Sequence, residues 1–298
     1  MSPKTRKQIA KVGLIGRKNL EGRASYIKSI IAFLNKQEVA VKYDNRIAEC
    51  IDDERNHMTV SRIMKEMDMV ITLGGDGTLL KAVRELNKDS QPIVLGVHLG
   101  TLGFLTEVHD HENLIPILKK IFKNKYYIDY RALLRVTVYR NNQKYKTFLA
   151  LNDAVINQGN FARLIELSVK IDQRKMIDFK ADGVIIATPT GSTGHSLSAG
   201  GPIIHPQLQA FIVTPICPST LSNRPIAIPN NRQLNIKIKT ERRFEDNDIG
   251  LTLDGQIILP LKYGDEIKIR KSSRDIKLIR ISGKKYYKTL RDKLGWGE

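Results

Sequence analysis

Hydrophobic residues in the first part of the chain form short continuous runs, separated by stretches with helical spacing. The runs Ile9–Gly16, Asp68–Leu73 and Pro92–Val97 have the length and composition of strands buried on both faces. Ala24–Asn35 places isoleucine and leucine three and four residues apart, which predicts an amphipathic helix. The same patterns predict a strand at Val39–Tyr43 and helices at Val60–Met67 and Leu79–Leu86. Strands that alternate with helices are typical of a parallel, doubly wound sheet, so this region is predicted to be α/β.

The pattern changes at Tyr126, after which apolar and polar residues alternate with a period of two. Leu133–Tyr139 and Leu164–Ile171 show this alternation, which is typical of antiparallel strands with one buried face. Asp254-Gly255 separates two short apolar runs and predicts a hairpin turn. The other strands predicted here are Tyr145–Asn157, Ile177–Thr188, Ile226–Ile228, Leu234–Ile238, Gly250–Leu253, Ile257–Leu259, Glu266–Ile269 and Ile276–Ile281. The second region is therefore expected to be mostly antiparallel sheet.

The change of pattern predicts two domains, in agreement with a length of 298 residues at about 150 residues per domain. Residues 1–125 are expected to form the α/β domain, and residues 126–274 a β-rich, sandwich-like domain. The tail 275–298 is expected to pack back on the first domain, with a short helix near Leu290.

Charge and composition argue against a membrane-spanning, secreted or disulfide-rich protein. Lys and Arg number 49 against 31 Asp and Glu, a formal charge of +18, so the basic residues either form solvated surfaces or attract anionic ligands. No apolar run approaches the roughly 20 residues of a membrane span, and the basic N-terminus is a poor match to a signal peptide. The two cysteines, Cys50 and Cys217, are too few for a disulfide framework. A cytoplasmic protein is expected.

The first candidate site is the turn Gly74–Thr78 (GGDGT), which follows a buried strand and opens a helix. Ligands bind at the carboxyl ends of strands in a parallel sheet, and glycines let the backbone approach phosphates closely. The N-terminus of the following helix favours negative charge. Because a carboxylate repels phosphate, Asp76 is expected to act as a general base or as a ligand to magnesium. The structural alternative is a tight turn in which Asp76 caps the helix.

Two further segments place polar residues next to strands. Asn152-Asp153 interrupts an apolar strand, and such a buried pair is hydrogen-bonded either within the core or to a ligand. Thr188–Gly201 is dense in hydroxyl residues and glycines, which supply donors without bulk and suit a phosphate or a ribose. It has the spacing of neither a Walker loop nor a serine-hydrolase elbow. An ordinary flexible loop is the alternative, although such a segment between strands is uncommon without a function.

Together these segments resemble the three signature segments of the NAD kinase family. The stretches that carry the resemblance are Gly74–Thr78, Asn152-Asp153 and Ala181–Ile203 (ADGVIIATPTGSTGHSLSAGGPI). Further stretches that resemble family segments are Gly100–Glu107, Leu221–Pro229 and Leu253–Gln256. GGDGT alone is shared with lipid kinases, whereas its combination with the third segment is much more specific.

The resemblance implies an N-terminal Rossmann-like domain followed by a C-terminal β-rich domain. It also implies a transfer of the γ-phosphate of ATP to the 2′-hydroxyl of the adenosine ribose of NAD, which gives NADP. The implied cofactor is Mg²⁺, bound with ATP, and the implied ligands are NAD, ATP and NADP. A homo-oligomer, either a dimer or a tetramer, is implied as well, and neither nucleic acid nor membrane is expected as a partner.

The resemblance also assigns roles to residues. It implies that Asp76 is the catalytic carboxylate, which orients the hydroxyl and accepts its proton, and that Asn152 and Asp153 hold the adenosine half of the dinucleotide. His195 stands where the family usually has tyrosine, so recognition of the adenine is expected to differ there. The other positions implied to bind ligands are Gly74, Gly75, Gly77, Lys81, Arg163, Lys180, Asp182, Thr193, Gly194, Ser196, Leu197, Ser198 and Gln256.

Two other functions are compatible with parts of the sequence. A lipid kinase would need a hydrophobic acceptor groove, and the sequence shows neither an apolar excess nor a membrane-binding helix. A non-catalytic nucleotide- or RNA-binding protein would use the charge of +18, but the aromatic content is only 6% and RNA-binding signatures are missing. His109 and His111 form an HxH pattern without the partners of a metal site, so no metal site built from protein ligands is predicted.

Overall fold

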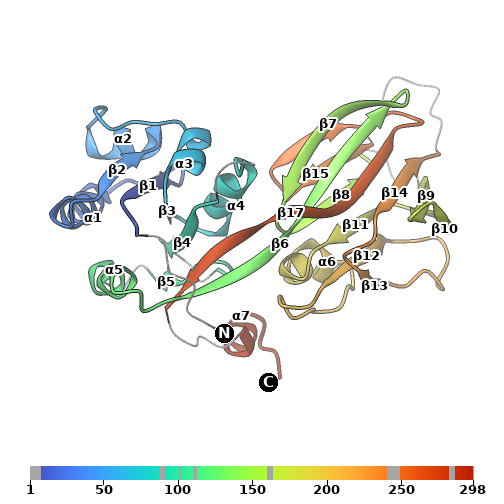
Figure 1. Cartoon of the computed structure of the whole chain (residues 1–298). Coiled ribbons are helices and arrows are strands. Elements are labelled where there is room, and N and C mark those ends of the chain that lie inside the picture. Colours follow the sequence, from blue (N-terminus) through green and yellow to red (C-terminus); the bar gives the residue numbers. More distant parts are fainter. Residues whose placement is uncertain are drawn as a thin grey trace. The chain divides into compact units, whose positions relative to one another are not determined.

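The computed structural model describes residues 8–87, 91–100, 103–109, 113–159, 164–239, 249–281 and 286–297. The chain divides into two compact units (Figure 1). The first unit comprises Met1–Tyr130 together with Ile276–Glu298, and the second comprises Arg131–Asp275. The first is α/β and the second is β-rich, which confirms the fold class predicted from the hydrophobic pattern.

The first unit is built on a parallel sheet with the strand order β2-β1-β3-β4. These strands are β1 (Lys11–Gly16), β2 (Ala40–Tyr43), β3 (Met69–Leu73) and β4 (Ile93–His98). The short strand β5 (Val108–His109) pairs with the end of β4, and the last part of β17 (Glu266–Arg280) pairs in parallel with the start of β4. β1, β3 and most of β4 are buried on both faces, as their continuous apolar runs predict.

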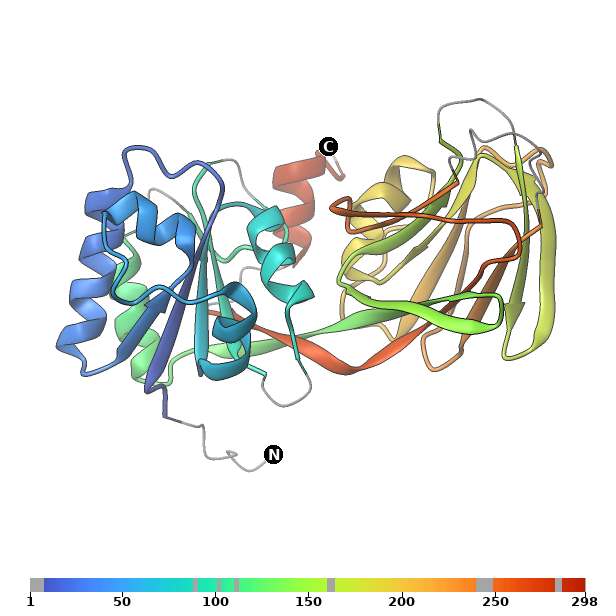
Figure 2. The same ribbon diagram turned by 90° about the horizontal axis from the view of Figure 1, so that it is seen from above.

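Helices cover both faces of this sheet (Figure 2). The helices are α1 (Ala24–Lys36), α2 (Asn45–Ile51), α3 (Val60–Glu66), α4 (Asp76–Arg84) and α5 (Leu114–Phe122). α1, α2 and α5 share one hydrophobic cluster with Val12 and Leu14 of β1. Gly13, between those two residues, faces the other way, where a Cβ would come within 3.0 Å of Met67 beside α3. Gly96 of β4 lies close to Leu79 of α4 in the same way, so glycines let α3 and α4 pack closely on this face.

The sequence pattern did not predict α2 or α5. α2 lies in a stretch whose charged residues hide a short apolar face formed by Ile47, Ala48 and Ile51. Its start is fixed by Asp44, whose side chain accepts a hydrogen bond from the Ile47 amide. The capping residue was therefore the available signal for this helix.

The second unit contains two antiparallel sheets that enclose one core. The first sheet has the order β13-β12-β11-β8-β15-β16, and the second is formed by β10-β9-β14-β17 with β6 and β7. The first-sheet strands are β8 (Asp153–Asn157), β11 (Gly183–Ala187), β12 (Ala210–Ile216), β13 (Ile226–Pro229), β15 (Gly250–Leu253) and β16 (Ile257–Pro260). The second-sheet strands are β6 (Tyr127–Arg140), β7 (Gln143–Ala150), β9 (Ile165–Ile171), β10 (Arg174–Ala181), β14 (Leu234–Ile238) and β17. Alternate residues of both sheets pack together in the core, which is the arrangement of a β-sandwich.

The outer face of the first sheet carries a short helical segment. Val155, Ile185 and Ile212 form a small cluster with Ala199 and Ile204, away from the main core. Along the chain, β11 is followed by the 3₁₀ turn η1 (Thr190–Thr193) and by the single helical turn α6 (His195–Ser198). Ala199 and Ile204, which contact the sheet, come directly after this helical segment. The segment predicted as a loop rich in glycine and serine is therefore folded against the sheet.

Two of the predicted strands are each two strands in different sheets. Tyr145–Asn157 divides into β7 and β8 at Leu151 and Asn152, and Ile177–Thr188 divides into β10 and β11 at Asp182. The apolar pattern continues through both breaks, because the residues on either side face the same core. The polar residues mark the points where the chain crosses from one sheet to the other.

The end of the described chain joins elements that the pattern separated. The strands predicted at Glu266–Ile269 and Ile276–Ile281 are one strand, β17, whose residues are shared between the two units. The helix expected near Leu290 is present as α7 (Tyr286–Leu294), with Leu290 buried in the first unit. No helix in the described part of the chain combines the length and the apolar character needed to cross a membrane.

Candidate active site

The turn after β3 needs glycine for steric reasons. The Gly74 amide donates to the carbonyl of Val97 at 2.9 Å, which ties the turn to β4. A Cβ on Gly74 would collide with the side chain of Thr78 and lie 2.8 Å from Cβ of Arg17. The Thr78 amide donates to the carbonyl of Gly75 at 3.0 Å as α4 begins. The turn therefore brings bare backbone to the carboxyl end of a central parallel strand.

Asp76 is held in place by a segment that follows it by almost thirty residues. Its Oδ2 accepts a hydrogen bond from the Phe104 amide at 2.8 Å, and its Oδ1 accepts one from the Leu105 amide at 3.2 Å. Gly103 packs so closely that a Cβ there would overlap the carboxylate. The side chain is half-buried, so the carboxylate is oriented by protein and still reachable from solvent. These are the properties expected of a general base.

Arg280, at the end of β17, fastens this segment. Its Nη1 donates to the Leu105 carbonyl at 3.1 Å and to Glu107 Oε2 at 3.2 Å, and its Nε donates to Asp129 Oδ2 at 3.1 Å. The guanidinium therefore binds the carbonyl of Leu105, the residue whose amide donates to Asp76. Sequence reasoning did not single out Arg280, because the partners in all three bonds lie more than 150 residues earlier in the chain and no local motif marks them.

Lys81, on α4, is engaged in an ion pair within the same unit. Its Nζ lies 3.2 Å from Oδ2 of Asp44, a fully buried carboxylate. Asp44 also accepts hydrogen bonds from the amides of Gly16 and Ile47, so it joins β1, the start of α2 and α4. This pairing gives Lys81 a structural partner as well as a place on the helix that begins at Asp76.

In the second unit, the turn before β8 is held by Asp254. Its carboxylate accepts hydrogen bonds from three consecutive amides, those of Leu151 at 2.9 Å, Asn152 at 2.7 Å and Asp153 at 3.1 Å. Burial raises the pKa of Asp254 to about 6, against the opposing effect of the three amides, and the nearby Asp153 charge contributes to the rise. The sequence placed Asp254 in a hairpin turn and in the stretch Leu253–Gln256 that resembles a family segment. Its role as an anchor was not predicted, because it depends on residues about a hundred positions earlier.

Thr188 fastens the other side of the same turn. Its Oγ1 donates to the Leu151 carbonyl at 2.6 Å, and its amide donates to the Asn152 carbonyl at 2.8 Å. Oγ1 also accepts from the Gly191 amide at 3.1 Å, at a point where a Cβ on Gly191 would overlap the backbone of Asn152. The second and third signature segments are thus packed directly against each other.

His195 and Asp153 form the polar centre of this cluster. The imidazole Nδ1 lies 3.2 Å and 3.3 Å from the two carboxylate oxygens of Asp153. The Asp153 side chain is 1% exposed and that of His195 is 57% exposed, so the acid is buried and the ring faces outward. Hydrogen bonding to Asp153 and its charge raise the pKa of His195, opposed by partial burial. A Cβ on Gly255 would lie 3.3 Å from the ring, so the hairpin after Asp254 borders the imidazole.

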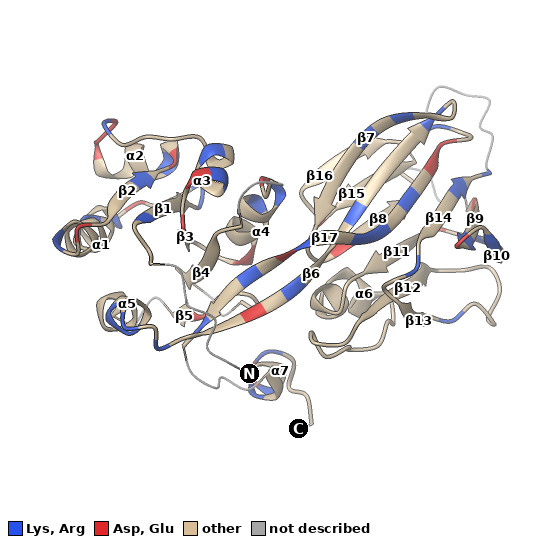
Figure 3. Ribbon diagram, viewed as in Figure 1, with Lys and Arg blue, Asp and Glu red and all other residues tan. Residues whose placement is uncertain are grey.

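The remaining predicted residues of this segment differ in accessibility. Ser196 is fully buried and its hydroxyl lies 3.0 Å from that of Thr214, so it holds α6 to β12. Ser198 is exposed, and the residues of intermediate exposure are Thr193, Gly194 and Leu197. α6, β12 and its two neighbours β11 and β13 carry no Lys, Arg, Asp or Glu, in contrast to β9, β10 and β17 of the second sheet (Figure 3).

Three further residues predicted to bind ligand lie on or beside strands of the second unit, outside the elements that carry Asp153 and His195. Lys180 is exposed on β10, and Gln256 is exposed after the hairpin. Asp182 accepts a hydrogen bond from the Gln158 side chain at 2.8 Å, where the chain crosses between sheets. Arg163 lies outside the described residues.

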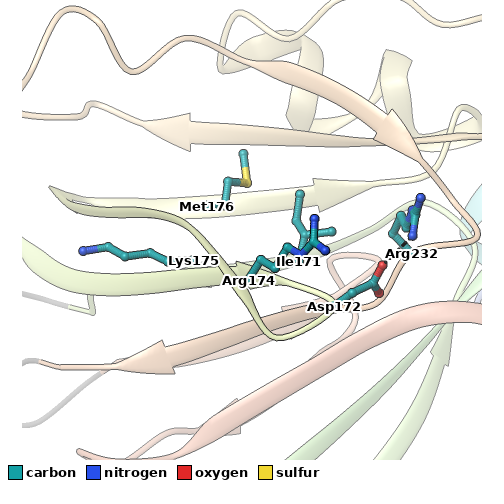
Figure 4. Close-up of a pocket in the computed structure, with 6 residues that line it drawn as sticks. All are labelled: Ile171, Asp172, Arg174, Lys175, Met176 and Arg232. Carbon is teal, nitrogen blue, oxygen red and sulfur yellow. Dashed lines mark hydrogen bonds and ion pairs between the residues drawn. The ribbon is translucent and has the colours of Figure 1, made fainter.

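A separate hollow of about 550 Å³ lies at the tip of the β9–β10 hairpin (Figure 4). None of the predicted site residues lines it, and its lining consists of Ile171, Asp172, Arg174, Lys175, Met176 and Arg232. Arg232 is paired with Asp172 at 3.0 Å, and Lys175 with Asp178 at 2.9 Å. These pairs reduce the charge available to an anionic ligand. Across the described residues, no group of three or more His, Cys, Asp or Glu side chains is placed to hold a metal ion.

Comparison with known proteins relates both units to one family. The family model of the ATP-NAD kinase N-terminal domain matches residues 12–126, and that of the ATP-NAD kinase C-terminal domain matches residues 151–281. An NAD kinase of Geotalea daltonii is 46% identical over 236 residues, covering 79% of this chain and 81% of the relative. An NAD kinase of Syntrophotalea carbinolica is 39% identical over 288 residues, covering 97% of this chain and 99% of the relative.

Solved structures show the same fold. Yeast NADH kinase, crystallised with NADH, superposes with a TM-score of 0.89 at 27% identity, covering 98% of this chain and 89% of that one. An NAD kinase from Archaeoglobus fulgidus in complex with ATP has a TM-score of 0.73 at 23% identity, covering 96% of this chain and 98% of that one.

Proposed function

This chain belongs to the NAD kinase family, and we propose that Asp76 is the carboxylate on which its reaction depends. The protein phosphorylates NAD with ATP and produces NADP. The observation that supports the role of Asp76 is its geometry: a half-buried carboxylate at the start of α4, fixed by the amides of Phe104 and Leu105. An acid that only capped the helix would accept hydrogen bonds from the first turn of α4.

The reaction needs a base because a ribose hydroxyl is a weak nucleophile. The 2′-oxygen forms a bond to the γ-phosphorus of ATP, the bond from that phosphorus to the β–γ bridging oxygen breaks, and ADP leaves. Asp76 orients the hydroxyl and accepts its proton, which then passes to solvent. Phosphoryl transfer depends mainly on positioning and on neutralising charge, so a rigidly held carboxylate suits this role.

The dinucleotide is proposed to bind at the cluster built around the turn before β8. Asn152 and Asp153 hold the adenosine half, and His195 presents its outward ring to the adenine or its ribose. Asp153 also fixes the ring of His195 through Nδ1. Gly74, Gly75 and Gly77 supply backbone at the reacting groups. The other residues proposed to contact ligand are Lys81, Arg163, Lys180, Asp182, Thr193, Gly194, Ser196, Leu197, Ser198 and Gln256.

The residues fit a Mg²⁺ ion that arrives with ATP better than a metal held by protein alone. Magnesium usually keeps several waters and is bound largely through the phosphates of its nucleotide, so Asp76 keeps its role as the base. Where the chain is described, no larger cluster of ligating side chains accompanies it. Bound Mg²⁺ supplies neutralisation of the phosphate charge.

Three broader properties belong to the same proposal. We propose that the protein is cytoplasmic, that it forms a homo-oligomer, either a dimer or a tetramer, and that it acts on neither nucleic acid nor membrane. We also propose that residues 126–274 form the dinucleotide-binding domain and residues 1–125 the domain that supplies Asp76. Cys50 and Cys217 are not joined in a disulfide, which suits a reducing compartment.

The experiment that tests the proposed function is a coupled assay of NADP formation from NAD, ATP and Mg²⁺. The wild-type protein is expected to form NADP, and sphingoid bases or diacylglycerol are expected not to replace NAD. Omission of Mg²⁺ is expected to abolish turnover. Phosphorylation of a lipid with no formation of NADP would contradict the proposal.

A further inference from the structure

The strand order of the first unit contains a topological switch point. From β1 the chain passes to β2 on one side of the sheet and then to β3 on the other, so β1 and β3 are neighbours whose following segments diverge. Ligands of open parallel sheets bind outside the carboxyl ends of the strands at this point. β3 is followed there by the glycine turn, and β1 is followed by Arg17. The Arg17 amide donates to the Leu73 carbonyl at 2.9 Å, which places it beside the turn.

The guanidinium of Arg17 is fixed by backbone carbonyls. Its Nη1 donates to Leu99 at 2.8 Å, its Nε donates to Asn19, and the residue is half-buried. These bonds leave Nη2 without an acceptor among the described residues. A Cβ on Gly100 would lie 4.0 Å from Nη1, so the cation stands between the glycine turn and the segment after β4. A solvated surface arginine would not be held in this way.

His98 adds a second unsatisfied group at the same place. The residue is 7% exposed, and its Nδ1 has no hydrogen-bond partner among the described residues. Its ring lies between Gly75, where a Cβ would be 3.7 Å from Nε2, and Gly100, where a Cβ would be 3.6 Å from Cε1. Burial lowers the pKa of His98, opposed by the charge of Asp76, while His109, Lys293 and Arg17 lower it further. A neutral imidazole there has one N–H to donate.

The backbone completes the set of donors. The amides of Gly75 and Asp76 open α4, where the first N–H groups of a helix have no acceptor within it. Neither amide has an acceptor elsewhere in the described chain. A fixed guanidinium, a buried imidazole and two helix-opening amides thus all border the glycine turn, and each of these groups binds oxyanions.

We propose that Arg17 and His98 are binding residues for a phosphate chain seated at the β1–β3 switch point. The inference rests on the proposed function, which supplies two phosphate-bearing ligands: the triphosphate of ATP and the pyrophosphate of NAD. Arg17 provides the charge, and His98 and the glycine turn provide directed hydrogen bonds. Nothing in the local sequence marks Arg17, since it is one of eight basic residues between Met1 and Lys28.

The test is calorimetric titration of the full chain, with ATP in the presence of Mg²⁺ and separately with NAD. Arg17→Gln removes the charge and keeps hydrogen-bonding capacity, and it is expected to weaken one of the two ligands about 10- to 100-fold, the usual effect of losing a charge-assisted hydrogen bond. Arg17→Lys keeps the charge but loses the planar fork, so a smaller loss is expected. Lys18→Gln is the matched control, because it removes an adjacent, exposed charge.

The outcomes separate the two ligands and the two proposals. A loss confined to ATP assigns the seat to the triphosphate, and a loss confined to NAD assigns it to the pyrophosphate. Equal effects of Arg17→Gln and Lys18→Gln, or no effect of either, would overturn the inference. Should Arg17→Gln fail to fold, inorganic tripolyphosphate must still compete with ATP or NAD on the wild-type protein, and Arg17→Lys must still weaken binding. Binding is measured without turnover, so failure of NADP formation would contradict the proposed function alone.

Discussion

Asp76 and Asp254 are anchored in the same way, but the two carboxylates differ in how accessible they remain to a ligand. Each carboxylate accepts hydrogen bonds from consecutive amides of a segment remote in sequence: Phe104 and Leu105 for Asp76, and Leu151 to Asp153 for Asp254. Asp76 is half-buried, whereas Asp254 is 6% exposed. The hydrogen bonds orient the carboxylate of Asp76 and leave it accessible. Those to Asp254 enclose its carboxylate and leave it no capacity to accept from a ligand.

The difference shows how similar local chemistry serves two purposes. A carboxylate that is oriented and reachable has lone pairs for a substrate, so its loss should affect the rate of reaction. A carboxylate enclosed by three amides has no such capacity, so its loss should affect the turn it holds and, through that turn, the binding of ligand. The predictions below test this division, beginning with the largest effect.

Asp76→Asn is expected to lower turnover by about 10²–10⁴-fold, because it removes the base and keeps the size of the side chain. The measurement is kcat for NADP formation, with circular dichroism to establish that the variant is folded. Asp254→Asn is the counterpart in the other unit and should retain more of kcat. Near-wild-type turnover of folded Asp76→Asn would remove Asp76 from the chemistry.

Asp254→Ala is expected to reduce the free energy of unfolding by about 3 kcal/mol, because three amides lose their acceptor and each unsatisfied buried donor costs about 1–3 kcal/mol. Urea denaturation measures this change. The dissociation constant for NAD should rise as well, since Asn152 and Asp153 are no longer held. Asp76→Ala should destabilise the protein less, because Asp76 accepts from two amides instead of three and is itself only half-buried. Equal destabilisation by both variants would contradict the division of roles.

Arg280→Gln is expected to lower kcat about tenfold with little change in the KM for NAD, because it loosens the segment whose amides orient Asp76. Steady-state kinetics separate the two constants. Arg280→Lys should recover part of kcat by keeping one donor. Asp129→Asn is the control, since it removes a partner of Arg280 and leaves the bond to Leu105 in place. A rise in KM with unchanged kcat would exclude a positioning role.

His195→Ala is expected to raise the KM for NAD several-fold and that for ATP less, while His195→Tyr is tolerated. The pKa of His195 is raised from its ordinary value of 6.5, so the ring stays protonated at pH values somewhat above 6.5. Its contribution to stability is therefore complete below pH 6.5 and is lost as the pH rises through the pKa of the folded protein.

If the imidazolium also binds the dinucleotide, affinity for NAD should fall over the same pH range, and His195→Ala should remove this dependence. Titrations with NAD at pH 6 and pH 8 measure it, with His205→Ala as a histidine outside the cluster. An unchanged KM for NAD in His195→Ala at both pH values would exclude the contact.

The sequence predicted features that depend on neighbouring residues and missed those that depend on distant ones. The strands of the first unit follow from continuous apolar runs, and the GGDGT turn is recognisable because its residues are adjacent. The crossings at Asn152 and Asp182 were missed, because the apolar pattern continues on both sides of them. The anchors Asp254 and Arg280 were missed for a related reason: a carboxylate in a hairpin turn and an arginine at a strand end gain their meaning only from partners that the fold brings to them.

The shared strand β17 has a consequence for the order in which the protein is made. Its last residues and α7 belong to the unit that the first 130 residues begin. Chains fold as they leave the ribosome, amino-terminal parts first. The sheet that carries Asp76 must therefore wait for Arg280 until the whole second unit has been synthesised, and until then the segment that orients Asp76 is not fastened. A nascent chain stalled after residue 275 would carry every signature motif and still lack the clamp on its carboxylate.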